Sequence, residues 1–142
     1  MNQSNTTVVQ NVYAAFNRGD IESVLANVEL NAEWVNYGPT SVPYFGNFTG
    51  RIMDFFQAIG QSTISGNVAV DRYIEAGGNV ITEGRWTATV KDTGGRIDAR
   101  IAHVFTLQDG KISSWRGYSD TAAVAAAHAA KAGDAISARR GR

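Results

Sequence analysis

The most constraining feature of the sequence is a pair of extended runs, residues 97–107 and 111–119, which meet at Asp109-Gly110. An Asp-Gly pair between two such runs predicts a hairpin, because Gly accepts the positive φ that a tight turn requires. Alternate positions of the first run are apolar and are expected to face a core; they are Ile97, Ala99, Ile101, Phe105 and Leu107. His103 interrupts that apolar face, so its ring needs a partner or lines a cavity.

Length and charge limit what such a hairpin can belong to. The chain has 142 residues, with 13 basic and 13 acidic side chains and no Cys. This length suits one domain with its own core, and the balanced charge favours neither nucleic acid nor a membrane surface as a partner. The lack of Cys excludes disulfides and thiolate chemistry. With no secretory signal and no apolar stretch of about 20 residues, the expected location is the cytoplasm.

Apolar residues at helical spacing predict two helices before the first strand. In the first helix they are Val8, Val9, Val12, Tyr13 and Phe16, and Gly19 ends it. Asp20 begins a second, short helix, whose buried side is expected to hold Ile21, Val24, Leu25 and Val28. Residues 31–37 alternate as in a strand, with Ala32, Trp34 and Asn36 on one face.

The next segment reads as a loop rich in Gly, Pro and aromatic residues, and is a candidate lid. Its aromatic residues are Tyr44, Phe45 and Phe48. A third helix is predicted from Gly50 or Arg51 to Gly60, followed by strands at 67–75 and 79–91 and then by the hairpin. Asp120 and Thr121 begin an alanine-rich helix.

This order predicts an α+β fold: a curved mixed or antiparallel sheet covered by helices, with a cone-shaped pocket between them. Residues 1–131 are expected to form a single domain, because no repeat or linker divides them. Residues 132–142 carry three arginines and little to bury. They are expected to be a mobile basic tail.

Four motifs in this order resemble the nuclear transport factor 2-like superfamily, and within it the SnoaL-like and ketosteroid isomerase-like branch. They are YAAFNRGDIESVL (13–25), EWVNYGP (33–39), YFGNFTGR followed by IMDFF (44–56), and HVFTLQDGKI followed by YSDTAA (103–123). The resemblance covers roughly residues 6–130. It implies the cystatin-like cone, a small apolar organic ligand and a homodimer formed through the outer face of the sheet. Isomerases, cyclases, dehydratases and non-catalytic binders share this fold.

The resemblance can be carried over one catalytic position at a time. Ketosteroid isomerases use a carboxylate base, with a Tyr and a protonated Asp as oxyanion donors. The base position falls on Asn36 and the Asp position on His103. The Tyr position falls on Val12, so Tyr13 is expected to be turned elsewhere on the helix. In SnoaL-like cyclases His103 matches a family His, and the catalytic Asp falls at or near Gly117. Because these acids are replaced, true steroid isomerase activity is not expected.

Two residues are candidate catalytic groups. His103 has a reference pKa of about 6.5 and suits a general acid, a general base or an oxyanion donor; alternatively, it is a neutral core residue satisfied by one neighbour. Asp120 is the acidic residue near the end of the hairpin, where it could pair with His103 or a substrate. The alternative for Asp120 is an N-cap of the helix that begins at Thr121.

The candidate ligand contacts are Tyr13, Trp34, Asn36, Phe56, Trp86, Trp115 and Tyr118. Among them Asn36 would orient a carbonyl or hydroxyl group, and the tryptophans would form walls or simply pack the core. The two histidines are far apart in sequence and lack carboxylates at ligand spacing, so no metal or other cofactor is expected.

Three functions remain open on this sequence. The leading one is a SnoaL-like or ketosteroid isomerase-like enzyme that isomerises, cyclises or dehydrates an apolar carbonyl-containing or polycyclic substrate by acid–base chemistry. The second is a ligand-binding protein without catalysis. The third is a dimerising accessory module whose own side chains fill the pocket.

Overall fold

Two helices open the chain, α1 (Asn5–Asn17) and α2 (Ile21–Leu25), in the computed structural model, which describes residues 4–129. Asp20 caps α2, since its side chain accepts a hydrogen bond from the Ser23 N–H. Val28 was expected on the buried side of this second helix, but it is the first residue of the next strand. It stays buried there, so its apolar character reports burial and not helical structure.

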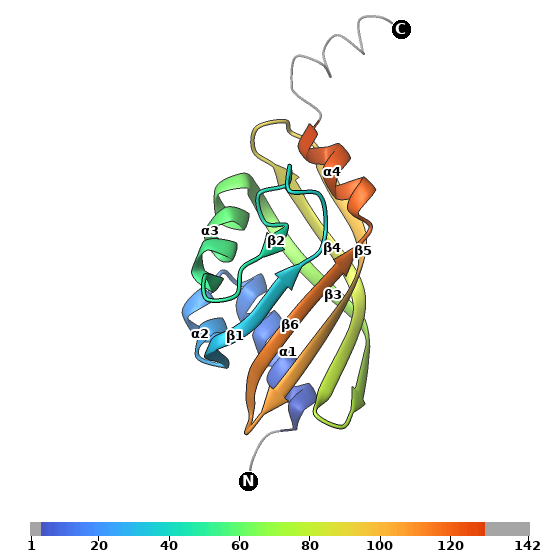
Figure 1. Ribbon diagram of the computed structural model, residues 1–142. Coiled ribbons are helices and arrows are strands. Elements are labelled where there is room, and N and C mark those ends of the chain that lie inside the picture. The colour runs from blue at the N-terminus through green and yellow to red at the C-terminus, as the bar shows by residue number, and fades with distance from the viewer. Residues whose placement is uncertain (1–3, 130–142) are drawn as a thin grey trace, which may run out of the picture.

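Six strands form one mixed sheet with the order β2-β1-β6-β5-β4-β3. Only β1 and β6 pair in parallel; the other neighbours are antiparallel. The strands are β1 (Val28–Asn36), β2 (Gly46–Asn47), β3 (Thr63–Ala76), β4 (Asn79–Val90), β5 (Arg96–Gln108) and β6 (Lys111–Ser119). The predicted α+β class and the curved mixed sheet are confirmed (Figure 1).

The β5–β6 hairpin forms as the sequence predicted. Asp109 and Gly110 both have positive φ, 52° and 79°, as a two-residue turn that follows the strand twist requires. In the ladder His103 stands between Thr82 of β4 and Gly117 of β6. His103 and its strand neighbour Phe105 are both buried, which confirms that this face of β5 points into the core.

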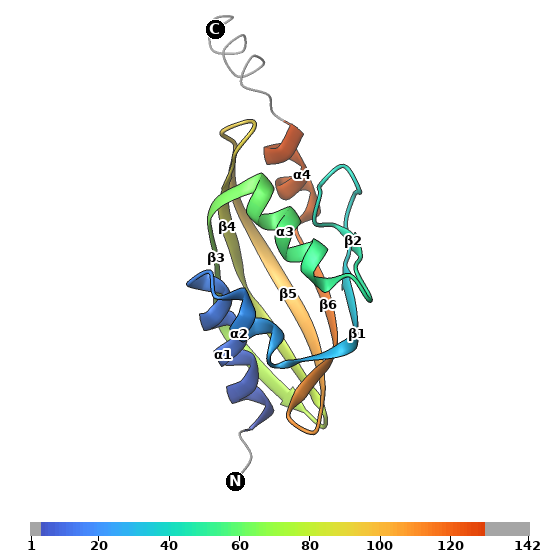
Figure 2. The same cartoon turned by 90° about the vertical axis from the view of Figure 1, so that its left-hand side faces the viewer.

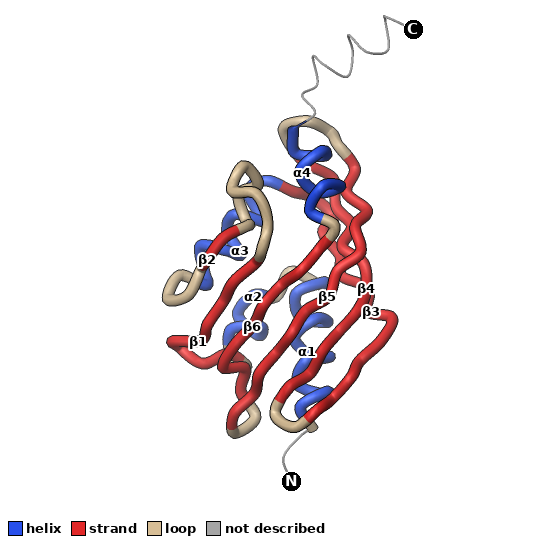
Figure 3. The backbone as a smooth tube through the Cα atoms, turned by 45° about the vertical axis from the view of Figure 1, so that its right-hand side comes forward, coloured by secondary structure: helices blue, strands red, loops and turns tan. Residues whose placement is uncertain are grey.

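Helix α3 (Ile52–Ser62) continues through Gly60, where the sequence predicted its end. One Gly inside a helix costs only about 1 kcal/mol relative to Ala. Burial of Ile52, Phe55 and Phe56 on the inner side of the helix outweighs that cost. The last helix, α4 (Thr121–Ala129), lies across one end of the sheet (Figure 3).

The loop before α3 is packed into the core. Its three aromatic side chains, Tyr44, Phe45 and Phe48, are all buried. Gly38 lies directly against the Phe45 ring, leaving no room there for a Cβ. The loop predicted as a candidate lid is therefore packed against the core in this structure.

Helices α1, α2 and α3 lie on one side of the sheet, and the other side carries no helix within residues 4–129 (Figure 2). The described part of the chain shares one core, built from the inner faces of the strands and these helices. It contains no helix long and apolar enough to cross a membrane. The predicted tail, residues 132–142, lies outside the described residues.

Candidate functional site

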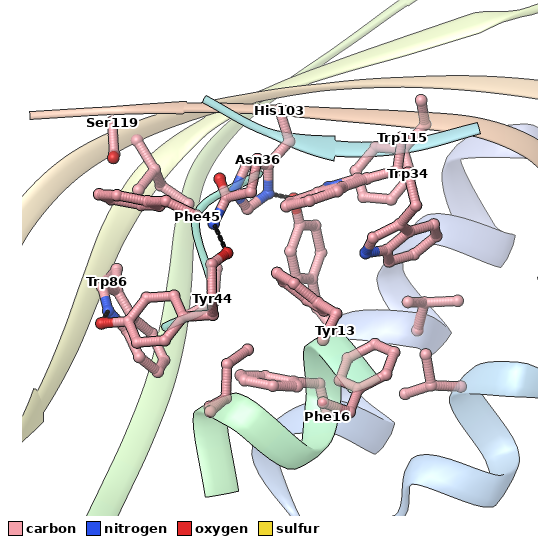
Figure 4. Close-up of a pocket in the computed structure, with 18 of the residues that line it drawn as sticks. Tyr13, Phe16, Trp34, Asn36, Tyr44, Phe45, Trp86, His103, Trp115 and Ser119 are labelled. Atoms are coloured by element: carbon pink, nitrogen blue, oxygen red, sulfur yellow. Dashed lines mark hydrogen bonds between the residues drawn. The ribbon is translucent and has the colours of Figure 1, made fainter. Parts of the chain in front are cut away.

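A cavity of about 90 Å³ lies between the sheet and the helices (Figure 4). Apart from a few polar groups, its walls are aromatic and aliphatic, and none of the charged side chains in the described part of the chain (Asp, Glu, Lys or Arg) lines it. His103 and six of the seven predicted ligand contacts line it, namely Tyr13, Trp34, Asn36, Phe56, Trp86 and Trp115. Typical ligand pockets hold about 300–1,000 Å³. A polycyclic molecule would therefore enter only if the aromatic walls moved apart.

His103 is joined to α1 by a short hydrogen bond. The Tyr13 hydroxyl lies 2.6 Å from His103 Nδ1 and 2.7 Å from Thr82 Oγ1. The expectation that Tyr13 turns elsewhere on the helix, with Val12 at the matched position, is wrong. Although both side chains line the cavity, it is the Tyr13 hydroxyl that reaches His103.

Burial keeps both partners of this bond neutral. It lowers the pKa of His103 to about 3 and raises the pKa of Tyr13 far above its usual range. The reason is that neither imidazolium nor phenolate can be solvated in an apolar wall. Near neutral pH, His103 therefore acts as a neutral donor or acceptor. Its Nε2 has no hydrogen-bond partner within residues 4–129.

Asn36 lies beside His103 in the cavity wall. Its Nδ2 donates to the Tyr44 carbonyl oxygen at 3.0 Å, which turns Oδ1 away from that carbonyl and toward Gly117. Both residues pair with Gly117 in the sheet, Asn36 from β1 and His103 from β5. A Cβ at Gly117 would stand 2.5 Å from Asn36 Oδ1 and 2.6 Å from the Trp115 ring. The position matched to the cyclase Asp therefore has no room for a side chain.

Two further polar atoms of the lining residues are buried without a partner, Trp34 Nε1 and Ser119 Oγ. Each costs about 1–3 kcal/mol relative to a satisfied group, unless a ligand or water fills the need. Ser119 was missed in the sequence analysis. The signal was present, because Trp115, Gly117 and Ser119 share one face of β6 by alternation.

Two of the predicted site residues lie outside the cavity. Tyr118 points to the opposite face of β6, where it is 44% exposed and stacks on Tyr37. Asp120 is exposed, and its Oδ1 accepts a hydrogen bond from the Ala123 N–H at the start of α4. The structure brings neither side chain to His103, and Asp120 caps the helix.

His128, to which the sequence analysis assigned no role, contacts Tyr44 of the cavity wall. Its Nε2 lies 2.8 Å from the Tyr44 hydroxyl, which also accepts a hydrogen bond of 3.4 Å from Trp86 Nε1. Tyr44 therefore ties α4 to the cavity wall through its hydroxyl and holds Asn36 through its carbonyl. Burial lowers the pKa of His128.

Residues 4–129 hold no group of three or more His, Cys, Asp or Glu side chains placed to bind a metal ion. The polar side chains that line the cavity are neutral hydrogen-bonding groups. Such groups can orient a ligand oxygen, polarise a carbonyl group, or exchange a proton with the ligand through His103.

The sequence profile of a family described as the SnoaL-like domain matches residues 9–115. No curated protein matches the chain. Among solved structures, an NTF2-like protein of unknown function from Burkholderia pseudomallei K96243 is 23% identical, with a TM-score of 0.83 and coverage of 90% of this chain and 100% of that one.

Two other solved structures show the same fold. TerC co-crystallised with polyporic acid is 24% identical, with a TM-score of 0.78 and coverage of 87% of this chain and 97% of that one. A hypothetical protein with a ketosteroid isomerase-like fold from Catenulispora acidiphila, in complex with trimethylamine, is 16% identical. It has a TM-score of 0.73, with coverage of 88% of this chain and 94% of that one. At these identities the likeness concerns the fold alone.

Proposed function

This chain belongs to the SnoaL-like domain family, and from that premise we propose that it binds a mostly apolar organic molecule in its cone and performs acid–base chemistry on it. The reaction would be an isomerisation, a cyclisation or a dehydration at a carbonyl group. One observation carries the proposal: His103, whose Nε2 has no partner within the described residues, belongs to the wall of a mostly apolar cavity.

Each polar group has a distinct part in this proposal. His103 would touch the reacting oxygen and exchange a hydrogen bond or a proton with it. Tyr13 would hold the ring in place through Nδ1, and Asn36 would orient the ligand. Trp34 and Trp115, whose rings stack with centroids 4.9 Å apart, would form an apolar wall.

Ligand discovery followed by a conversion assay tests the proposal. Thermal-shift screening of aromatic ketones, sterols and polyketide-like compounds identifies binders, and each binder is then incubated with the protein and recovered. With a converted compound, His103→Gln should reduce turnover by about 10²- to 10⁴-fold, the typical contribution of general acid–base catalysis. Arg96→Gln, at an exposed position of the same strand, is the control and should leave turnover unchanged. Conversion that survives His103→Gln would remove His103 from the mechanism.

A non-catalytic ligand-binding protein is the second candidate. It is favoured by a cavity lining that, in the part of the chain that the structure describes, includes no carboxylate, and by Asn36 at the position matched to the isomerase base. On this alternative, ligands would be recovered unchanged after long incubation. His103→Gln would then change affinity alone, by about tenfold for one hydrogen bond in a buried site.

Steroid isomerisation is the activity that we do not expect. An amide at position 36 cannot take up the proton that a carboxylate base removes, so turnover of a β,γ-unsaturated ketosteroid should be negligible. Absorbance of the conjugated product measures this directly. Turnover within about a hundredfold of a true isomerase would be a loss no larger than the smallest typical contribution of one acid–base group, about 10², and would contradict the residue matching.

We also propose that the protein works as a homodimer through the outer face of its sheet. Outward side chains of β4 and β5 form a partly exposed apolar strip on that face, which consists of Ile81, Ala102 and Val104. Ion pairs lie on these and the adjoining strand: Arg72 of β3 pairs with Glu83 of β4, and Arg85 of β4 pairs with Asp98 of β5.

A further inference from the structure

We infer that the cavity is built for an uncharged ligand in which a carbonyl oxygen neighbours a hydroxyl group. The carbonyl would accept a hydrogen bond from His103 Nε2–H, and the hydroxyl would donate one to Asn36 Oδ1. This inference rests on the proposed ligand site and specifies the ligand class that the site takes.

The tautomer of His103 follows from counting hydrogens in a buried chain of three groups, Thr82 Oγ1, Tyr13 Oη and His103 Nδ1. The separations along the chain are 2.7 and 2.6 Å. Thr82 is fully buried, and its hydroxyl has no other hydrogen-bond partner within residues 4–129. Its hydrogen can therefore be used only if Thr82 donates to Tyr13.

In one direction of this hydrogen-bond chain, both hydroxyl hydrogens have an acceptor. Tyr13, whose oxygen accepts from Thr82, donates its own hydrogen to Nδ1, and the ring proton of neutral His103 resides on Nε2. If Nδ1 carried the proton and donated to Tyr13, either the Tyr13 or the Thr82 hydrogen would be buried without an acceptor. Each direction leaves one donor without an acceptor in the described part of the chain: Nε2–H in the first, a hydroxyl hydrogen in the second. His103 lines the cavity, where a ligand or a water can accept from Nε2–H, whereas Thr82 is fully buried and does not line it, so the first direction costs less. His103 thus offers a donor to the cavity.

Asn36 offers the complementary acceptor. The Tyr44 carbonyl can only accept, so the amide nitrogen must face it, and Oδ1 is turned to the other side. Oδ1 has no hydrogen-bond partner in the described part of the chain. An oxygen of this kind, in a residue that is 8% exposed, can accept a hydrogen bond from a ligand donor.

The donor and the acceptor converge because Gly117 lies between them. Asn36 and His103 sit on the two strands that flank β6, and both pair with Gly117. Because Gly117 has no side chain, Asn36 Oδ1 occupies the space there, 2.5 Å from where a Cβ would stand. Figure 4 shows Asn36 beside His103. A donor and an acceptor on neighbouring carbons of one small molecule suit such a pair.

The lack of charged side chains in the described cavity lining disfavours charged ligands. Within residues 4–129 no Lys or Arg lines the cavity to balance a carboxylate, and no Asp or Glu lines it to balance an amine. A carboxylate would also place a negative oxygen against Asn36 Oδ1, which is itself an acceptor. The site should therefore reject organic acids in their ionised form.

Nitrogen NMR of the ligand-free protein tests the tautomer without any ligand. In protein with ¹⁵N-labelled histidine, the ring nitrogen that carries the proton has a pyrrole-type shift and the other a pyridine-type shift. The His103→Gln variant, which lacks the ring, assigns the signals. We expect His103 Nε2 to be protonated near neutral pH. A protonated Nδ1 would overturn the inference.

Three matched probes test the ligand class: 2-hydroxyacetophenone, acetophenone and benzoate. Binding is followed by titration of backbone amide shifts in the wild-type protein. The hydroxyketone should bind about tenfold or more tightly than acetophenone, which lacks the donor for Asn36, and benzoate should not bind. In Asn36→Leu the advantage of the hydroxyketone should disappear. If that variant does not fold, the wild-type comparison alone decides.

The outcomes separate this inference from the proposed function. Binding of acetophenone as tight as that of the hydroxyketone, or tight binding of benzoate, would overturn the ligand class while leaving a ligand site. If none of the three probes binds, the proposed function fails, and the ligand class fails with it.

Discussion

The position of His103 and its protonation state have different causes. The position of the ring on the inner face of β5 follows from strand alternation, and the structure confirms it. The neutrality of the ring follows from its surroundings, which include Phe105 and Trp115 at centroid distances of 6.2 and 5.0 Å. Apolar neighbours penalise the charged form, so the pKa moves away from physiological pH instead of toward it.

This shift predicts a pH dependence of stability. The pKa of His103 is about 3 in the folded protein and about 6.5 in the unfolded chain. Between these values the unfolded chain binds a proton that the folded protein does not. The free energy of unfolding therefore falls as the pH falls, by up to about 1.4 kcal/mol per pH unit from this group.

Urea unfolding of His103→Gln tests this dependence. The variant should have a smaller slope of the free energy of unfolding against pH below about pH 6.5, the reference pKa of His. His128→Gln, at a half-buried ring, should flatten it less. Equal slopes in wild type and His103→Gln would contradict the assignment.

Gly117 predicts a steric effect at the same site. In Gly117→Ala the new methyl group would stand 2.5 Å from Asn36 Oδ1 and 2.6 Å from the Trp115 ring, which is closer than van der Waals contact. Overpacking of this kind lowers the free energy of unfolding by about 1–3 kcal/mol. Gly60→Ala is the matched control. It lies inside α3 with nothing within 4 Å of its Cβ, and should be neutral or stabilising by up to about 1 kcal/mol. Chemical denaturation measures both; a neutral Gly117→Ala would show that the cavity wall yields.

Sequence reasoning located the strand residues of the site better than the helical ones. Alternation identified His103, Asn36 and Trp115, because a strand has only two faces. On a helix, a shift of one residue turns the side chain by about 100°, so matching to Val12 could not fix the direction of Tyr13. The Tyr44–His128 contact joins residues 84 positions apart, and no local pattern encodes it.

Among the elements, α4 decides between two roles for Asp120. The carboxylate receives the Ala123 N–H and so satisfies one of the free donors at the start of the helix. Asp120→Ala should lower the free energy of unfolding by about 0.5–2 kcal/mol, whereas Asp120→Asn, which keeps an acceptor oxygen, should retain most of the stability. If Asp120 were instead a catalytic acid or base, Asp120→Asn would abolish turnover with stability unchanged.

The sequence predicted the end of a helix or strand correctly where a tight turn follows it. The Asp109-Gly110 turn fixed the hairpin, since both residues adopt the required positive φ. Gly60 did not end α3, because no left-handed turn occurs there and the apolar side of the helix continues to pack. A Gly indicates a helix end only where the backbone uses its freedom, and the sequence does not reveal where that happens.

For the whole molecule, the sheet has one face closed by helices and one face open within residues 4–129 (Figure 2). The inner face carries the cavity. On the outer face Ile81 and Val104 are direct cross-strand neighbours, and Val104 in turn pairs with Arg116. An apolar strip with charged flanks suits a second copy of the same surface, because two such strips bury each other while the charges stay at the rim.

A charge placed in the middle of that strip tests the homodimer. In Val104→Asp, dimerisation would bury two unpaired carboxylates close to the two-fold axis, so the variant should sediment as a monomer where the wild type sediments as a dimer. Leu30→Asp is the control: Leu30 is 91% exposed in β1, at the irregular part of its pairing, and its replacement should leave the dimer intact. Circular dichroism of both variants checks that the fold persists, as expected for two side chains that lie outside the core. A monomeric wild type at micromolar concentration, or a dimeric Val104→Asp, would mean that the outer face is not the interface.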